Sequence, residues 1–126
     1  MQDFKELIIW QKTHAFVLGL YKSFTYFPKD EAYNLVSQLR RAATSIPTNI
    51  AEGTGRFTQK DFASFLQIAL GSTHETGYLI LLSKDLGFLI MEQYNVYSQQ
   101  INEIKAMLIS LIKESKRLIQ FFTLNF

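Results

Sequence analysis

Residues 91–122, MEQYNVYSQQINEIKAMLISLIKESKRLIQFF, decide the fold of this chain. A stripe recurs there at alternating steps of three and four residues: Tyr94, Tyr97, Ile101, Ile104, Leu108, Leu111, Ser115, Leu118 and Phe122. This spacing places the stripe along one side of an α-helix, as in the coiled-coil-like seams where helices cross at roughly 20°. We therefore predict a long helix over about 91–122 that packs against other helices.

Three further segments with helical periodicity precede this one, and we place them at about 9–27, 30–53 and 58–86. Pro28 ends the first, because the residue before a proline disfavours the helical conformation. Thr58 is expected to cap the third helix at its start, and Gly87 to end it. Short connections between four helices of this kind favour antiparallel neighbours.

Pro47 falls inside the apolar stripe of the second segment, which keeps its phase from Val36 to Ile50. Because proline lacks an N–H and crowds the preceding turn, we predict one helix bent near Pro47 rather than two helices. Gly71 and Gly77 lie inside the third segment, where glycine costs up to about 1 kcal/mol relative to alanine. We expect close helix crossings at both glycines.

The predicted fold is all-α: an antiparallel up-and-down four-helix bundle, formed as a single domain over residues 1–126. Eleven Phe and six Tyr are more aromatic side chains than a domain of this size readily buries. Apolar surface beyond one core usually lies in a subunit interface, so we expect a homo-oligomer.

Composition excludes several functional classes. The formal charge is only +2, so any basic surface must come from local clustering. No cysteine is present, which excludes disulfides, thiolate metal sites and a cysteine nucleophile. The N-terminus has alternating charge unlike a signal peptide, and the longest uncharged stretch, 62–73, is too short to span a bilayer. We expect a cytoplasmic protein with no membrane partner.

The sequence lacks the motifs that are typical of a catalytic or metal site. His14 and His74 have no acid three residues before them, as di-iron bundles require, so we expect both at the surface. No Gly-x-Ser-x-Gly nucleophile motif occurs. Residues 53–56 (GTGR) lack the Gly-Lys-Ser/Thr ending of a phosphate loop and mark the end of a helix instead. We predict no enzyme activity, no metal and no cofactor.

Four cations are the candidate nucleic-acid contacts: Arg40, Arg41, Arg56 and Lys60. Guanidinium groups bind phosphate oxygens through two donors, and a small patch gains strength when an oligomer repeats it. The alternative interpretation is a solvated face whose cations pair with nearby acids such as Glu52 and Asp61.

The run SQLRRAATSIPTNIAEG at 37–53 resembles the signature of the 23S ribosomal RNA intervening-sequence protein family, also called the four-helix bundle protein family. Matching pieces lie in the same order elsewhere in the chain: 10–12, 27–29, 65–72, Glu75 and 84–87. The resemblance covers about Phe4 to Leu118. Gly77 departs from it, since the family tends to place an acid there, and His74 and Tyr78 are atypical neighbours.

The resemblance implies a four-helix bundle that assembles as a homopentamer. Some members are encoded within insertions in large-subunit ribosomal RNA genes. A related branch includes the accessory protein of diversity-generating retroelements, a basic pentameric barrel that works with a reverse transcriptase and nucleic acid. Our first hypothesis is therefore a non-catalytic oligomer that associates with RNA or DNA. The alternative is a protein-interaction scaffold that docks an unidentified protein, and the apolar tail Phe121–Phe126 motivates it.

Overall fold

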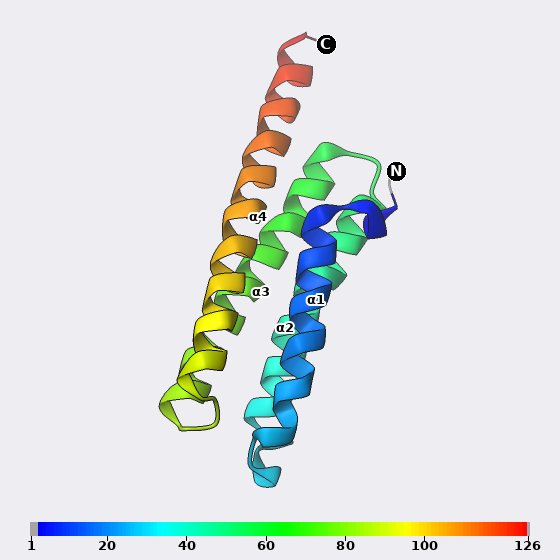
Figure 1. Ribbon diagram of the computed structural model, residues 1–126. Coiled ribbons are helices and arrows are strands. Elements are labelled where there is room, and N and C mark those ends of the chain that lie inside the picture. Colours follow the sequence, from blue (N-terminus) through cyan, green and yellow to red (C-terminus); the bar gives the residue numbers. More distant parts are fainter. Residues whose placement is uncertain (1–2, 126) are drawn as a thin grey trace.

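The computed structural model describes the backbone of residues 3–125 and all of their side chains except those of residues 122, 124 and 125. Within this part of the chain the α-helices are α1 (Ile8–Ser23), α2 (Leu35–Thr54), α3 (Gln59–Asp85) and α4 (Met91–Asn125). The four run alternately up and down in Figure 1, so consecutive helices are antiparallel. The prediction of an all-α four-helix bundle is confirmed.

The core is formed by the predicted helical stripes. In α4, Tyr97, Ile101, Ile104 and Leu108 are all at most 7% exposed. Opposite them, the stripe of α2 is fully buried at Leu39, Ala43, Ile46 and Ile50. The apolar period of these sequences therefore decides which side of each helix faces its neighbours.

Two helix ends differ from the prediction. The first helix stops being α-helical at Ser23 and continues as a 3₁₀ turn, Phe24–Tyr26, before Phe27 becomes extended in front of Pro28. The second helix begins at Leu35 and not near residue 30, because Lys29–Glu31 forms a separate 3₁₀ turn. These tighter turns carry the chain across the end of the bundle from α1 to α2.

Both ends of α3 follow the predicted chemistry. The Thr58 hydroxyl accepts a hydrogen bond from the Asp61 backbone N–H at 3.1 Å, which caps the helix N-terminus. At the other end Gly87 adopts φ +83°, a left-handed conformation that glycine takes without a side-chain penalty. The N–H of Phe88 then bonds to the Ser83 carbonyl at 2.9 Å and closes the helix.

The expected close crossings at Gly71 and Gly77 are wrong. A Cβ atom added to Gly71 would meet nothing within 4 Å. One added to Gly77 would lie 3.6 Å from Ile101 Cγ2, an ordinary van der Waals contact with α4. The close approach in this bundle occurs at Gly53 instead, where an added Cβ would lie 3.0 Å from Phe62 Cδ1 and from Phe65 Cβ. Gly53 therefore allows the end of α2 to contact α3.

α4 extends beyond the other helices at its C-terminal end (Figure 1). The predicted tail Phe121–Phe126 falls on this end, but Phe126 and the side chains of residues 122, 124 and 125 lie outside the described part. Phe121 is 49% exposed. Within residues 3–125, no helix combines the length and the apolar character needed to cross a bilayer.

Candidate functional site

α2 remains one continuous helix across Pro47, and side chains donate hydrogen bonds to several backbone carbonyls near it. Proline offers no N–H to the carbonyl four residues before it. Around this gap the Thr44 hydroxyl donates to the Arg40 carbonyl at 2.6 Å, and the Thr48 hydroxyl donates to the Thr44 carbonyl at 2.7 Å. The Asn49 amide donates to the Ser45 carbonyl at 2.8 Å. The motif around Pro47 thus builds a helix whose outer side carries hydroxyl groups beside a buried proline ring.

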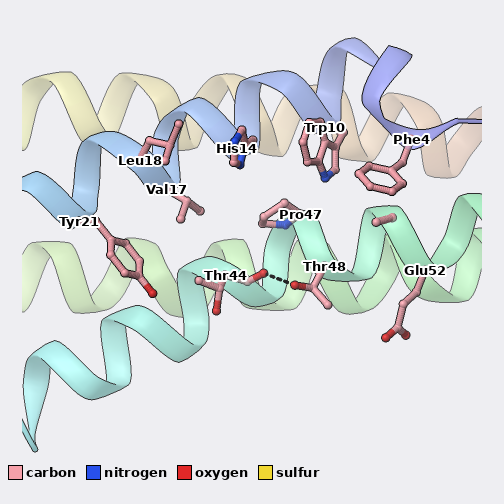
Figure 2. A pocket seen from close by; sticks show the side chains of 11 residues that line it. Phe4, Trp10, His14, Val17, Leu18, Tyr21, Thr44, Pro47, Thr48 and Glu52 are labelled. Atoms are coloured by element: carbon pink, nitrogen blue, oxygen red, sulfur yellow. Dashed lines mark hydrogen bonds between the residues drawn. The ribbon is translucent and has the colours of Figure 1, made fainter.

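An open apolar groove of about 560 Å³ runs between α1 and α2. Figure 2 shows side chains from the two helices facing each other across it, with Tyr21 toward one end and Phe4 and Glu52 toward the other. Pro47 and Val17 form part of its floor and are buried, whereas Leu18 is 53% exposed. The groove therefore offers an apolar surface large enough to bury part of another molecule.

Three aromatic rings contact one another in series at the Phe4 end of this groove. The Trp10 and His14 rings are nearly parallel, 12° apart, with centroids separated by 4.8 Å. Phe4 meets Trp10 edge to face at 4.9 Å. His14 is exposed, as predicted, and its ring contact with Trp10 makes it part of the groove wall.

The side chains of Arg40 and Arg41, both on α2, contact different neighbouring elements. The Arg40 guanidinium lies 5.5 Å from the Tyr21 ring centroid and 5.4 Å from that of Phe24, so it makes cation–π contacts with the α1 side of the bundle. Arg41 forms a hydrogen-bonded ion pair with Glu75 of α3. The pairing acids that we predicted, Glu52 and Asp61, are not the partner of Arg41.

Arg56 and Lys60 flank the turn between α2 and α3. The Arg56 guanidinium lies 4.8 Å from the Phe65 ring centroid, and both Arg56 and Lys60 are exposed. Phe57 stands between them and is 89% exposed. Arg56 and Phe57 also line a shallow hollow of about 380 Å³ at this turn. The turn thus combines two cations with an exposed aromatic ring.

The four predicted contacts do not form one patch in a single protomer. Arg41 is separated from the end of α2 at Thr54 by about 20 Å of helix axis. Arg40 and Arg41 themselves lie against different helices. The structure therefore brings together Arg56 and Lys60 at one turn and leaves Arg40 and Arg41 apart from them.

The acidic and histidine side chains of the described residues stay dispersed. No three His, Asp or Glu side chains gather there in a way that could hold a metal ion. In one exposed pair on α4, the side-chain hydrogen bond from Arg117 lowers the pKa of Glu114 and raises that of Arg117. Shifts of this kind accompany ordinary surface ion pairs.

Sequence reasoning missed the α1–α2 groove and the exposed Phe57. Pro47 was interpreted only as a source of bending, although a proline ring inside an apolar stripe also adds apolar surface. A signal for the turn was present in residues 56–60 (RFTQK), in which a bulky aromatic follows a helix-ending glycine and lies between two cations. An aromatic at such a position has no helix stripe to join.

This chain is similar to known proteins in both sequence and structure. The profile of the family described as 23S rRNA-intervening sequence protein matches residues 5–110. A solved structure from Bacteroides thetaiotaomicron, of a protein with unknown function from the S23 ribosomal protein family, superposes with a TM-score of 0.78. It is 28% identical, and the match covers 84% of this chain and 96% of that one. No curated protein matches. With its bundle, its α2 motif and a profile match over most of its length, the chain belongs to the 23S rRNA-intervening sequence protein family.

Proposed function

We propose that this protein is a non-catalytic, cytoplasmic homo-oligomer, a pentamer by its family resemblance, that associates with RNA or DNA. The observation that supports the nucleic-acid role best is the α2–α3 turn, where Phe57 is 89% exposed between two exposed cations. Single strands bind where cations follow the backbone and aromatic rings stack on the bases.

The two remaining cations have a secondary part in this proposal. Arg40 packs on aromatic rings, an arrangement that leaves the edge of a guanidinium available to phosphate oxygens. Arg41 must exchange Glu75 for a phosphate, so its contribution is smaller. A ring of subunits would repeat these contacts, and multivalency would raise the affinity of each weak patch.

The test is binding of the purified protein to labelled single-stranded RNA and DNA at two salt concentrations, followed by fluorescence anisotropy. Light scattering on the same sample measures the oligomer. We expect steep salt dependence, and removing two phosphate contacts should reduce the slope by about 1.4 for each engaged protomer.

Three variants separate the contacts: Arg56→Ala with Lys60→Ala, Phe57→Ala, and the substitution of all four cations by alanine. The matched control replaces the exposed Lys22 and Lys29 by alanine, which changes the net charge by the same amount as the first variant. Unchanged binding in the four-residue variant would exclude these contacts. If the Lys22 and Lys29 control lost as much affinity as the Arg56 and Lys60 variant, the loss would be explained by net charge alone.

The α1–α2 groove favours a second candidate function, a scaffold that docks a protein partner. Trp10 is the only tryptophan in the chain and lines this groove, so its fluorescence reports on anything that covers it. Leu18→Glu places a charge in the groove, and Ile68→Glu makes the same change on α3 at a residue of similar exposure. A pull-down that loses a partner only with Leu18→Glu supports the scaffold. Recovery of the protein alone contradicts it.

A further inference from the structure

A separate hollow of about 310 Å³ lies between α3 and α4. It shares no lining residue with the α1–α2 groove or with the turn that carries Phe57. Gly77 and Ile101 form its apolar floor, and Ile101 is only 5% exposed. Because Gly77 has no side chain, the space above Ile101 stays open.

The rim of this hollow carries a cation without an anion. Of the thirteen Lys and Arg residues, Lys84 and Lys105 are the half-buried ones. Lys84 pairs with Asp85 at 3.3 Å, whereas Lys105 has no ion-pair or hydrogen-bond partner among the residues that the structure describes. No carboxylate lines the hollow. A half-buried lysine at the rim of an acid-free hollow is suited to an incoming anion.

An amide, an imidazole and two aromatic rings surround the same space. Asn102 and His74 line the rim and have no hydrogen-bond partner within the described chain. Tyr78 is 60% exposed, and Tyr94 is half-buried with the Lys84 ammonium 4.6 Å from its ring centroid. The hollow therefore combines flat apolar surfaces with a cation and an amide at one rim.

From this combination the geometry points to a binding site for one nucleotide unit in the α3–α4 hollow. The base stacks against the Tyr78 or Tyr94 ring, and the phosphate pairs with Lys105 while Asn102 donates a hydrogen bond. An inorganic anion alone would leave both rings unused, and an apolar ligand would desolvate Lys105 without compensation. The volume lies at the lower end of the roughly 300–1,000 Å³ usual for ligand sites.

The nucleotide is either free or part of a strand. If the nucleotide is part of a strand, the hollow adds a specific contact to the nucleic-acid association proposed above, and this inference rests on that proposed function. If the nucleotide is free, the inference is independent of the proposed function. Lys60 and Gly77 are about 25 Å apart along α3, so variants at the turn and at the hollow test different sites.

The first experiment titrates the full-length protein with adenosine 5′-monophosphate and follows backbone and Asn side-chain amides by NMR. Adenosine and inorganic phosphate are titrated separately. We expect saturable shifts centred on Gly77 and Asn102 with the nucleotide, and weaker binding of either half. Shifts that fail to saturate, or that centre on Phe57, would overturn the site.

Variants then assign the contacts. Lys105→Met keeps the aliphatic stem and removes the charge, and we expect it to weaken nucleotide binding by roughly tenfold or more. Tyr78→Ala removes an exposed ring and should weaken binding by roughly fivefold or more. The controls are Lys113→Met on α4 and Tyr33→Ala, which is 92% exposed. Equal losses in a control and its matched variant would contradict the assignment.

A strand experiment distinguishes the two sources. Labelled single-stranded oligoadenylate is bound to the wild type and to Lys105→Met. If Lys105→Met weakens oligoadenylate binding, the hollow binds a nucleotide within a strand. If the protein binds the free nucleotide and Lys105→Met leaves oligoadenylate binding unchanged, the hollow is a site for free nucleotide. If the nucleotide does not bind and the strand is insensitive to Lys105→Met while remaining sensitive to Arg56→Ala, the hollow is refuted and the proposed function stands.

Discussion

Tyr97→Phe is expected to weaken the attachment of α1 to α4. The Tyr97 side chain projects from α4 and is 7% exposed. Its hydroxyl donates to the Gly19 carbonyl at 3.2 Å and shares a hydrogen bond with the Ser23 hydroxyl, both on α1. Its ring meets Phe16 edge to face with centroids 6.0 Å apart. Phenylalanine keeps the ring contact and removes only the hydroxyl.

The expected loss follows from the two hydrogen bonds. Each is worth about 1 kcal/mol net, and Ser23, which is 2% exposed, would lose its Tyr97 partner. We therefore predict a fall of about 1–2 kcal/mol in the free energy of unfolding. With a urea dependence of about 1–3 kcal/mol per molar for small proteins, the midpoint should fall by roughly 0.3–2 M.

The assay is urea unfolding followed by far-ultraviolet circular dichroism at one fixed protein concentration, because assembly makes stability depend on concentration. Tyr33→Phe is the control, since Tyr33 is 92% exposed. Ser23→Ala and the double variant complete a cycle, in which we expect a coupling of about 1 kcal/mol. A loss below about 0.5 kcal/mol, typical of surface substitutions, would refute the reasoning.

Three further predictions follow from the packing and the helix ends. Leu108→Ala empties a fully buried position and should lower the free energy of unfolding by about 2–5 kcal/mol in the same urea assay; a smaller loss would mean that the core collapses around it. In Gly87→Ala the added Cβ meets no atom within 4 Å, but a residue with a side chain must adopt φ +83°. The free energy of unfolding, measured by thermal denaturation, should therefore fall by about 1–2 kcal/mol. An unchanged melting curve would contradict this. Arg117→Ala should raise the pKa of Glu114 toward its ordinary value, because the hydrogen bond from Arg117 lowers it; the pair stabilises the fold above the ordinary carboxyl pKa and loses this effect as pH falls through the lowered pKa. NMR titration of the Glu114 carboxyl measures the shift, and an unchanged pKa would count against the bond.

Sequence periodicity was sufficient to locate the helices and most of the core. The stripe in residues 91–122 predicted the buried positions Ile104 and Leu108 because a helix repeats every 3.6 residues whatever it packs against. The helix ends were less accurate. Phe24–Tyr26 and Lys29–Glu31 form 3₁₀ turns, whose hydrogen bonds differ from those of an α-helix by one residue and leave little trace in the sequence.

The candidate sites were predicted less completely than the fold. Arg40 and Arg41 are adjacent in sequence, but neighbouring residues on a helix point about 100° apart, so one contacts α1 and the other α3. The hollow beside Lys105 could not be foreseen at all. It depends on which residues of α3 and α4 come opposite one another, and Gly77 faces Ile101 only in the folded bundle.

By itself the sequence determined the helical class, the buried side of each helix and the caps at Thr58 and Gly87, because these depend on local hydrogen bonding and on a fixed helical period. The tertiary structure alone decided the α1–α2 groove, the separation of the four cations and the α3–α4 hollow. Each of these depends on the lateral distance and register between helices, and those are set by the packing of side chains from segments far apart in the chain.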